Sequence, residues 1–468
     1  MAAIALASVA ISVAMIPCCL RRTGVPARLF AAATRRPPAA VLRQPPPDQR
    51  GRFIDSIDEA AEALRAGRLV AFPTETVYGL GAHAFDADAV ASIFTVKGRP
   101  RSDPLIVHVS TPAAAEALVM LDAKGLALMR QLMASFWPGP LTLVAPACPA
   151  LPPAVTAGTG WVGVRMPKHT RALELLSAAA VPVAAPSANR FGHVSPTRPE
   201  HVMDDLGAHP ILVLNPDKAS AGAPSTCCDV GIESTVLKLD AAASELLLLR
   251  RGGVPEAELV RWLAATPTGF KLRIQPPKQA LKHPPPTSPV DEAATDAAAT
   301  GSSEMTGMVA PGMLLTHYAP DLPSFLVRAP PHDPTAPASG APLPPPMRFA
   351  LRDAVLLDFG GQLRRFESSC CAYRDLSPTA DANEAAALVF EALRWAEAQT
   401  ARGGRCVLLP NLMPPSEGGM GGARAPPSSS SLTDEALPAV ADRLFRAASG
   451  REAWLSADEQ SLVVEPED

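Results

Sequence analysis

Three basic side chains within a short stretch are the first sign of chemistry in this sequence. Lys97, Arg99 and Arg101 alternate along residues 97–104, which also carry two prolines and a glycine. An extended chain points alternate residues to the same side, so the three cations would face one way. Guanidinium groups bind phosphate oxygens through paired hydrogen bonds. The spacing favours binding of a triphosphate, and the alternative is a solvated basic loop.

Other polar clusters follow predicted strands, at the positions where α/β sheets bind ligands. Residues 73–81 place two threonine hydroxyls and a carboxylate ahead of two glycines. The other candidates are His108, Arg165, Ser187, Asn189, Ser195, Ser234 and Arg250. Each alone also fits a helix cap, a turn, a core histidine or a surface charge. Together they describe a nucleotide cleft better than a metal site or a nucleophile site, although Walker A and G-x-G-x-x-G motifs are absent.

Composition restricts the class of protein. The 468 residues are 47% hydrophobic, which suits two or three domains with a sizeable core. The net charge of −4 gives no broad basic footprint for nucleic acid. With 52 prolines and 31 glycines, folded blocks separated by linkers are expected. The eight cysteines form no C-x-x-C pair, which argues against a zinc site or disulfide scaffold and favours a reducing compartment.

The N-terminal residues resemble a targeting segment. Residues 1–47 contain six arginines and no acid, as in a transit peptide for the mitochondrion or plastid. The apolar run 2–20 has no basic residue before it, so a signal anchor or bipartite signal is an alternative. An unstructured extension on a cytoplasmic protein is the third reading. We expect cleavage, and no stable membrane association of the mature form.

Proline-rich and small-residue stretches divide the rest of the chain. Residues 276–309, 330–346 and 413–431 carry too little apolar surface to offset the entropy of ordering. The expected organisation is a targeting or disordered extension at 1–51, a first block at 52–270, a proline-rich linker and lid at 271–320, and a smaller second block at 321–465.

The first block alternates strands and helices irregularly, which predicts an α/β fold with a mixed, twisted sheet. Ser56 and Glu59 form a capping box that begins a helix ending at Arg65. Further helices are expected at 87–94, 113–118, 126–136, 171–180, 199–206 and 256–264. Strands are expected at 69–72, 105–109, 141–145, 162–166, 181–185, 211–214, 235–239 and 246–249.

The second block reads as a small α/β layer without a catalytic cluster. Strands are expected at 324–327, 354–357, 371–373 and 406–409. Helices are expected at 383–399, with one apolar face, and at about 434–448. Support for a lid or a partner surface is the expected role, and the adjacent Cys370 and Cys371 are expected to be buried packing residues.

Seven motifs in order carry a family resemblance. They are FPTETVYGLG at 72–81, KGRP at 97–100, PLIVH at 104–108, WPGPLT at 137–142, VRMP at 164–167, APSAN at 185–189 and ESTV at 233–236. Over residues 52–262 the chain strongly resembles the YrdC-type threonylcarbamoyl-AMP synthases. PGMLLTHYAP at 311–320 resembles the junction of the long form of this family, which adds a Rossmann-like domain. The resemblance implies a YrdC-like sheet with flanking helices, followed by that smaller domain.

The resemblance also implies a reaction. The family converts L-threonine, bicarbonate and ATP, with magnesium, into threonylcarbamoyl-adenylate and pyrophosphate. A separate tRNA threonylcarbamoyl-transferase complex then modifies the adenosine beside the anticodon, and a weak contact with tRNA is also expected. No protein nucleophile is needed, so catalysis rests on positioning and on neutralising phosphate charge.

Site residues transfer by motif position. The resemblance places Thr76, His108, Arg165, Ala185 and Ser234 around threonine. It places Lys97, Arg99, Asp103, Ser187, Asn189, Ser195 and Arg250 at ATP, with Tyr318 closing over the nucleotide. Lys97, Arg99 and Arg165 are the expected catalytic cations, no general base is evident, and no metal ligand is assigned. The lid is expected from residues 276–309 and the junction through Pro320.

Three departures from the family pattern concern the site. Asp103 stands where the family usually has asparagine, and a carboxylate there would repel a triphosphate unless it meets a cation or magnesium. The usual Asp-Gly-Gly turn before ESTV is absent, which leaves the path of 215–228 open. Arg251 replaces the proline of the usual Leu-Arg-Pro-Gly, which loosens that turn.

Two other functions compete with the synthase. An RNA-binding, translation-associated module could use the same basic concave surface, but it needs cations spread over a wide face. A carbamoyltransferase of the hydrogenase-maturation kind shares the domain. Its zinc-finger part requires C-x-x-C pairs, which this chain lacks.

Overall fold

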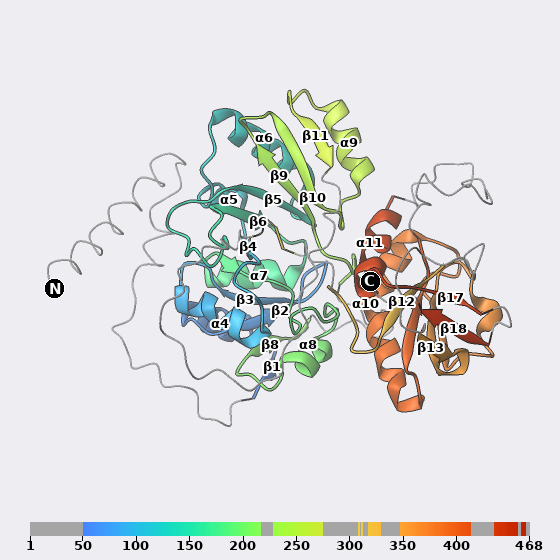
Figure 1. Cartoon of the computed structure of the whole chain (residues 1–468). Coiled ribbons are helices and arrows are strands. Elements are labelled where there is room, and N and C mark those ends of the chain that lie inside the picture. The colour runs from blue at the N-terminus through green and yellow to red at the C-terminus, as the bar shows by residue number, and fades with distance from the viewer. Residues whose placement is uncertain are drawn as a thin grey trace, which may run out of the picture.

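The computed structural model contains two sheets that lie side by side (Figure 1). It describes residues 50–216, 228–274, 308, 310–311, 317–328, 347–412, 435–456 and 460–464. The expected targeting segment and most of the expected linkers fall outside these ranges. Among the described residues, no helix is both long and apolar enough to cross a membrane.

The first sheet has eleven strands and mixes parallel with antiparallel pairs, which confirms the predicted fold class. In spatial order the strands are β1 (Arg52–Ile54), β8 (Leu212–Leu214), β2 (Val70–Phe72), β3 (Gly79–His83), β7 (Val183–Ala184), β4 (Ile106–His108), β6 (Trp161–Arg165), β5 (Leu141–Pro146), β9 (Thr235–Asp240), β10 (Glu245–Arg250) and β11 (Lys271–Ile274). Strand β4 is parallel to β6 and antiparallel to β7, so His108 and Arg165 are register partners.

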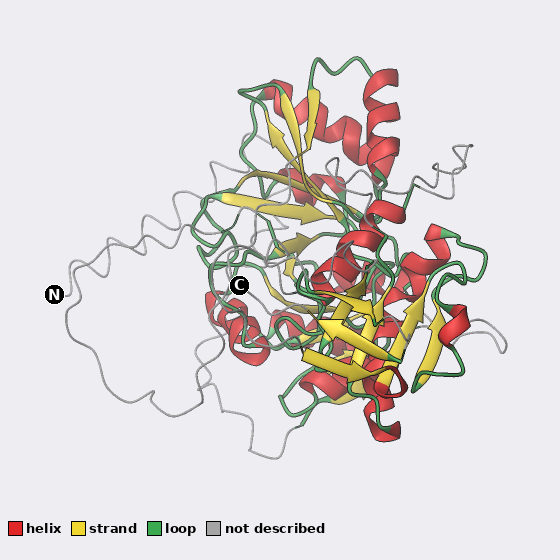
Figure 2. Cartoon of the chain, turned by 45° about the vertical axis from the view of Figure 1, so that its right-hand side comes forward, coloured by secondary structure: helices red, strands yellow, loops and turns green. Residues whose placement is uncertain are grey.

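Helices cover both faces of this sheet (Figure 2). They are α3 (Ile57–Arg65), α4 (Ala87–Lys97), α5 (Pro112–Glu116), α6 (Ala123–Phe136), α7 (Thr170–Ala179), α8 (Pro199–Leu206) and α9 (Glu256–Ala265). The predicted cap of α3 is confirmed, because the amide of Glu59 donates to Ser56 Oγ at 3.2 Å. Helices α3 and α7 pack on one apolar cluster, whereas α4 and α6 pack on another.

Strand β3 was not among the predicted strands, because residues 73–81 were treated as one polar cluster after a strand. Only residues 73–78 form a loop, and β3 then enters the centre of the sheet. A side chain at Gly81 would lie 2.8 Å from Val183 and 2.9 Å from Phe72. The glycines therefore allow close packing inside the sheet, rather than only a turn.

The basic stretch also differs from the prediction. Lys97 is the last residue of α4, and Gly98 ends the helix with a left-handed φ of 64°. Lys97 and Arg99 are buried, whereas Arg101 is exposed. The expected extended chain with three aligned cations is therefore wrong, and two cations face inward.

The second sheet has seven strands, five of them parallel, and forms the predicted Rossmann-like α/β layer. Its spatial order is β13 (Met347–Ala350), β18 (Ser461–Val464), β17 (Glu452–Leu455), β12 (Ser324–Val327), β16 (Cys406–Leu409), β14 (Ala354–Asp358) and β15 (Ala372–Asp375). Strands β13, β17 and β18 were not predicted. The helices are α10 (Ala382–Ala398) and α11 (Leu437–Ala447), with short η1 (Leu351–Asp353), η2 (Arg364–Phe366) and η3 (Gln399–Arg402). Cys370 and Cys371 are only half-buried.

Helices α10 and α11 lie between the two sheets and pack against the first block (Figure 1). Val77, Val194 and Ile232 of the first block share one buried apolar cluster with both helices. At Gly231, with a φ of 70°, an added Cβ would lie 2.4 Å from the backbone of Ala387 in α10. The loop before ESTV thus meets the second block backbone to backbone, which only glycine permits.

Candidate functional site

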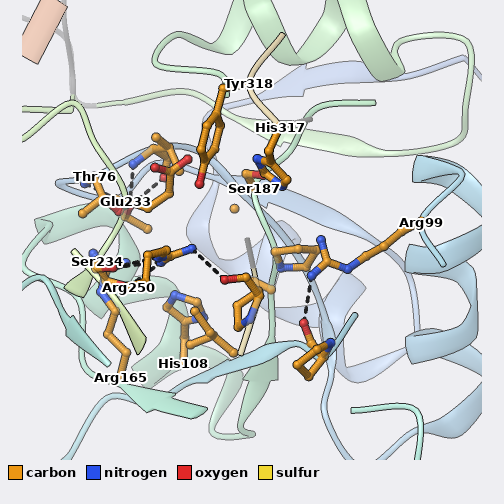
Figure 3. Close-up of a pocket in the computed structure, with 18 residues that line it drawn as sticks. Thr76, Arg99, His108, Arg165, Ser187, Glu233, Ser234, Arg250, His317 and Tyr318 are labelled. Atoms are coloured by element: carbon orange, nitrogen blue, oxygen red, sulfur yellow. Dashed lines mark hydrogen bonds between the residues drawn. The ribbon is translucent and has the colours of Figure 1, made fainter. Parts of the chain in front are cut away.

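A cavity of about 560 Å³, including its open mouth, lies beside the central strands of the first sheet (Figure 3). Its lining residues are Thr74, Thr76, Val77, Gly79, Arg99, Pro104, Ile106, His108, Arg165, Ala185, Pro186, Ser187, Glu233, Ser234, Arg250, Pro311, His317 and Tyr318. Most come from the loops and strand ends that the sequence singled out. The last three come from the junction between the blocks.

Arg99 reaches the cavity from the end of α4 and is fixed by its own loop. Its Nη2 atom lies 2.9 Å from Asp103 Oδ2, and its Nε and Nη2 donate to the carbonyls of Asp103 and Pro104 at 3.2 and 2.8 Å. Burial raises the pKa of Asp103, while Arg99 and Lys97 oppose that rise. Asp103 therefore meets a cation and does not line the cavity, which removes the repulsion expected from this departure.

Lys97 lies behind the lining rather than in it. Its Nζ donates to the carbonyl of Ser187 at 2.7 Å and also to the carbonyl of Asn189. Burial, reinforced by Arg99, lowers the pKa of Lys97 well below its ordinary value. The lysine thus anchors the loop that carries Ser187, and its ammonium lies next to that loop's backbone.

Arg165 ends β6 beside His108 of β4. Its Nη2 lies 2.8 Å from Glu75 Oε1, and its Nε donates to the carbonyl of Gly139 at 3.3 Å. Burial and the neighbouring Arg165 lower the pKa of His108 to about 3, so this histidine is neutral near pH 7. The group therefore offers one fixed cation beside a neutral hydrogen-bonding ring.

Arg250, at the end of β10, joins the sheet to the junction. It donates to the carbonyl of Ser234 at 2.8 and 3.1 Å, to Ser234 Oγ at 3.2 Å and to the carbonyl of Pro311 at 3.4 Å. No carboxylate forms an ion pair with it in the described part of the chain. Arg250 thus remains a net positive charge in the cavity wall.

Glu233 is an acidic lining residue that was not among the predicted site residues. Ser195 Oγ donates to its Oε1 at 2.7 Å, and Arg443 Nε of α11 donates to its Oε2 at 3.0 Å. Asn189 holds the loop that leads to Ser195 by donating to the carbonyls of Arg190 and His193, both at 2.7 Å. Ser195 and Asn189 therefore support the lining from behind.

Residues of the junction close one side of the cavity (Figure 3). The amide of Met308 donates to the carbonyl of Ser102, and the amide of Ala319 donates to the carbonyl of Gly192, both at 2.9 Å. Tyr318 is fully buried with a φ of 64°, a conformation that an aromatic residue adopts only when its surroundings hold it. Residues 276–307, which were expected in the lid, lie outside the described residues.

Nine predicted residues line one cavity. They are Thr76, Arg99, His108, Arg165, Ala185, Ser187, Ser234, Arg250 and Tyr318. Lys97, Asp103, Asn189 and Ser195 form a layer behind them. Glu75, Glu233 and His317 were missed as functional side chains, although each falls within a quoted motif, because a motif does not show which member faces the ligand.

The remaining departures are local. Arg251 pairs with Glu256 at 2.9 Å, and Gly252 packs so closely that a Cβ would lie 2.3 Å from the carbonyl oxygen of Glu233. The turn thus keeps its close approach without the proline. Residues 217–227, which make up most of the segment 215–228, lie outside the described residues.

Two family models match this chain, one over each block. Residues 62–252 match the family model Sua5_yciO_yrdC, described as telomere recombination, and residues 290–449 match the model described as threonylcarbamoyl-AMP synthase, C-terminal domain. Threonylcarbamoyl-AMP synthase of Pyrococcus abyssi is 38% identical over 272 residues, which are 58% of this chain and 67% of that protein. The Bacillus subtilis enzyme of the same name is 38% identical over 283 residues, covering 58% of this chain and 69% of that protein.

The chain belongs to the threonylcarbamoyl-AMP synthase family.

A solved structure agrees with this assignment over both blocks. The crystal structure of P. abyssi Sua5 complexed with L-threonine superposes with a TM-score of 0.61 at 28% identity. It covers 87% of this chain and 99% of that chain. The family's long form, with its additional C-terminal domain, is therefore the form present here.

The carboxylates around the cavity of this family member are already paired. Glu75 faces Arg165, Asp103 faces Arg99, and Glu233 faces Arg443 and Ser195. A second cluster, in which ligand atoms of His193, Asp321 and Glu397 lie within 4.8 Å of one another, sits between the blocks. His193 there bonds to Asp205 and Glu397, and Asp321 pairs with Arg190. The described residues thus leave no unpaired carboxylate in the cavity wall to hold a resident metal ion.

Proposed function

We propose that this protein makes L-threonylcarbamoyl-adenylate and pyrophosphate from L-threonine, bicarbonate and ATP. The product would serve the threonylcarbamoyl modification of the tRNA adenosine beside the anticodon. The observation that carries the proposal is the cavity itself, where fixed cations from the family's motifs converge under the junction residues Pro311, His317 and Tyr318. The protein is then an enzyme of the nucleotidyltransferase type.

The reaction needs no nucleophile from the protein. The amino group of threonine attacks the carbon of bicarbonate, and loss of water leaves a carbamate. A carbamate oxygen attacks the α-phosphorus of ATP, and pyrophosphate leaves. Such a sequence depends on holding three reactants in line and on neutralising phosphate charge.

The threonine end of the cavity is assigned to Arg165 and His108. Arg165 is oriented by Glu75 and the carbonyl of Gly139, so its guanidinium is pre-positioned for the carboxylate of an amino acid. His108 is neutral and can hydrogen-bond without adding charge. Thr76, Ala185 and Ser234 complete this end with hydroxyls and a small side chain.

The phosphate end is assigned to Arg99 and Arg250. Arg99 is balanced by Asp103, whereas Arg250 is held by carbonyl oxygens and keeps its charge for a ligand. Lys97 positions the Ser187 loop from behind, and Tyr318 covers the nucleotide. Closing the cavity protects an adenylate that water would hydrolyse.

Magnesium belongs to the proposal as part of the substrate. Because the carboxylates in and around the cavity are paired with arginines, we assign the ion to the triphosphate oxygens and give it no protein ligand. Bound there, it would neutralise phosphate charge during transfer.

The arrangement of charge argues against the RNA-binding alternative. Lys97, Arg99 and Arg165 are buried at 6% exposure or less; Arg99 and Arg165 line one cavity, and Lys97 lies directly behind its lining. An RNA-binding face would present its cations to solvent over a wider surface. A weak contact with tRNA and transfer to a downstream complex stay proposals that rest on the resemblance.

Pyrophosphate release tests the proposed reaction. The full chain is incubated with ATP and magnesium, and threonine and bicarbonate are omitted in turn. Release that requires both substrates is the expected result. Folded protein that binds ATP but releases no pyrophosphate with threonine present would overturn the proposal.

Organelle targeting is a separate proposal that rests on the arginine-bearing, acid-free residues 1–47. Fusion of residues 1–51 to a fluorescent protein tests it, with mitochondrion and plastid as the expected destinations. A diffuse cytoplasmic signal would contradict it.

A further inference from the structure

The second block sends one fully buried arginine into the neighbourhood of the cavity. Arg443 lies on α11 with no exposure to solvent, and it is the largest fully buried side chain among the described residues. A buried guanidinium is costly unless every donor finds an acceptor. The partners of Arg443 therefore indicate what holds it there.

Two of those partners, Glu233 and Tyr318, line the cavity. Its Nε donates to Glu233 Oε2 at 3.0 Å, its Nη2 donates to the carbonyl of Arg251 at 2.9 Å, and its Nη1 donates to Asp442 at 3.0 Å. Its Cζ atom lies 5.5 Å from the ring centre of Tyr318, within reach of a cation–π contact. One side chain of the second block thus touches the acidic wall residue, the turn after β10 and the tyrosine of the junction.

Glu233 explains why this contact concerns the nucleotide. A carboxylate in the wall of a triphosphate cavity repels its ligand unless a cation neutralises it. Arg443 forms the only ion pair with Glu233 in the described part of the chain, at 3.0 Å. The other carboxylate oxygen accepts from Ser195, so the position of the serine also depends on where Glu233 points.

We propose that Arg443 is a positioning residue for nucleotide binding, by which the second block completes the cavity of the first. It neutralises Glu233, orients Glu233 toward Ser195 and supports the ring of Tyr318. The role of the second block is therefore more than packing, and it acts on ATP rather than on threonine. This inference rests on the proposed function, because it assigns the ligand of that same cavity.

A second ion pair between the blocks provides a matched control. Arg261 of α9 forms a bidentate ion pair with Glu435, which lies shortly before α11; its Nη2 is 3.0 Å from Oε2. Arg261 is half-exposed and lines no part of the cavity. Removing it breaks a bond between the same two parts of the chain without touching Glu233, Ser195 or Tyr318.

The experiment compares Arg443→Met, Arg443→Lys and Arg261→Met in the full chain. ATP affinity is measured by calorimetry without turnover, and kcat and KM are measured from pyrophosphate release. Arg443→Met is expected to weaken ATP binding at least tenfold while the KM for threonine changes less than threefold. Arg443→Lys should recover part of this loss, because an ammonium still neutralises Glu233. Arg261→Met should match the wild type.

Several outcomes separate a positioning role from a structural one. Arg443→Met protein with a lower melting temperature but wild-type ATP affinity and KM would overturn the inference. If Arg443→Met does not fold, ATP affinity is measured for Arg443→Lys, for Ser195→Ala and for the double variant. A loss in the double variant equal to the product of the two single losses would overturn the inference, because the two residues would then act independently. A loss smaller than that product supports the inference that both residues act through Glu233. Failure of the proposed function is distinct, since wild-type protein would then release no pyrophosphate with threonine.

Discussion

The carboxylate of Asp103 lies 2.9 Å from the guanidinium of Arg99, and neither side chain reaches solvent to more than 3%. The two residues are four positions apart, across the turn that follows α4. Because burial alone raises the pKa of Asp103, the arginine is what favours its charged form. In the ATP-free protein the pair stabilises the loop. It also occupies Arg99, the cation that we assign to the phosphates of the nucleotide.

Replacing Asp103 with asparagine separates these two effects. Asp103→Asn removes the ion pair and leaves a buried arginine, which costs roughly 3–5 kcal/mol when nothing compensates. Bound ATP would compensate it, so affinity for ATP should rise several-fold while the melting temperature without ligand falls. Calorimetry and thermal melts with and without ATP measure both. A loss of ATP affinity would show that Asp103 assists the nucleotide directly.

Lys97 is expected to act through the Ser187 loop. Lys97→Met keeps the aliphatic stem but leaves the carbonyls of Ser187 and Asn189 without this donor. Each buried acceptor left unpaired costs about 1–3 kcal/mol, partly offset because the buried ammonium is removed as well. We expect a lower melting temperature and at least tenfold weaker ATP binding. Lys124→Met, which removes an exposed lysine bound to Ser244, serves as the control; equal effects of the two variants would contradict this role.

The sequence predicted the fold class because hydrophobic periodicity and caps are local signals. Ser56 caps α3 as expected, and the four strands predicted in the second block are present as β12, β14, β15 and β16. Strand β3 was missed because Gly79 and Gly81 lack the side chains that favour strands, although Gly81 is needed for close packing against Phe72 and Val183. Strands β13, β17 and β18 were also missed, although β17 and β18 pair with each other as neighbours along the chain; β17 also pairs with the distant β12, and β18 with β13.

The sequence motifs predicted which segments form the site, but not which side chain of each motif lines the cavity. Sequence order identified Arg99, Arg165 and Arg250, but it placed Lys97 in the lining instead of behind it. The alternation rule failed there because Gly98 turns the chain. Arg443 gave no local signal, since its role arises only when α11 packs against the first block.

Arg165 is expected to select the amino-acid substrate. Arg165→Lys keeps the charge but loses the fork that can hold a carboxylate and Glu75 together. A charge-assisted hydrogen bond is worth about 1.5–3 kcal/mol, so the KM for threonine should rise at least tenfold while ATP affinity changes little. Arg130→Lys, at the surface pair with Glu116, should leave both values unchanged. A larger effect on ATP than on threonine would reverse the assignment of this end of the cavity.

His193 links the two blocks through charged neighbours on both sides. Its Nδ1 lies 2.8 Å from Asp205 of α8, and its Nε2 lies 3.1 Å from Glu397 of α10. Arg394 also pairs with Asp205, at 2.9 Å. Burial lowers the pKa of His193, but the hydrogen bonds to Asp205 and Glu397 outweigh it, so the pKa is raised above 6.5 despite the nearby Arg394.

Other charged groups surround this histidine without changing the direction of that shift. Arg190 and Asp321 pair at 2.9 Å on the exposed side. The pKa of His201 is lowered to about 3 by burial and by the neighbouring arginines, so it stays neutral over the range of interest. The pKa of Asp205 is lowered to about 2, mainly by His193 and Arg394 acting against burial, so it stays charged.

Stability of the interface should therefore fall as pH rises through the folded-state pKa of His193. Because the pKa of His193 is raised on folding, its contribution to the free energy of unfolding is fully present below about pH 6.5. That contribution is lost as the pH rises above the pKa of His193 in the folded protein. His193→Gln keeps hydrogen bonding but removes the titration, so its melting temperature should change less than that of the wild type between pH 6 and pH 9. Thermal melts of both proteins across this range measure the difference. Parallel curves would show that His193 does not carry the pH dependence of the contact between the blocks.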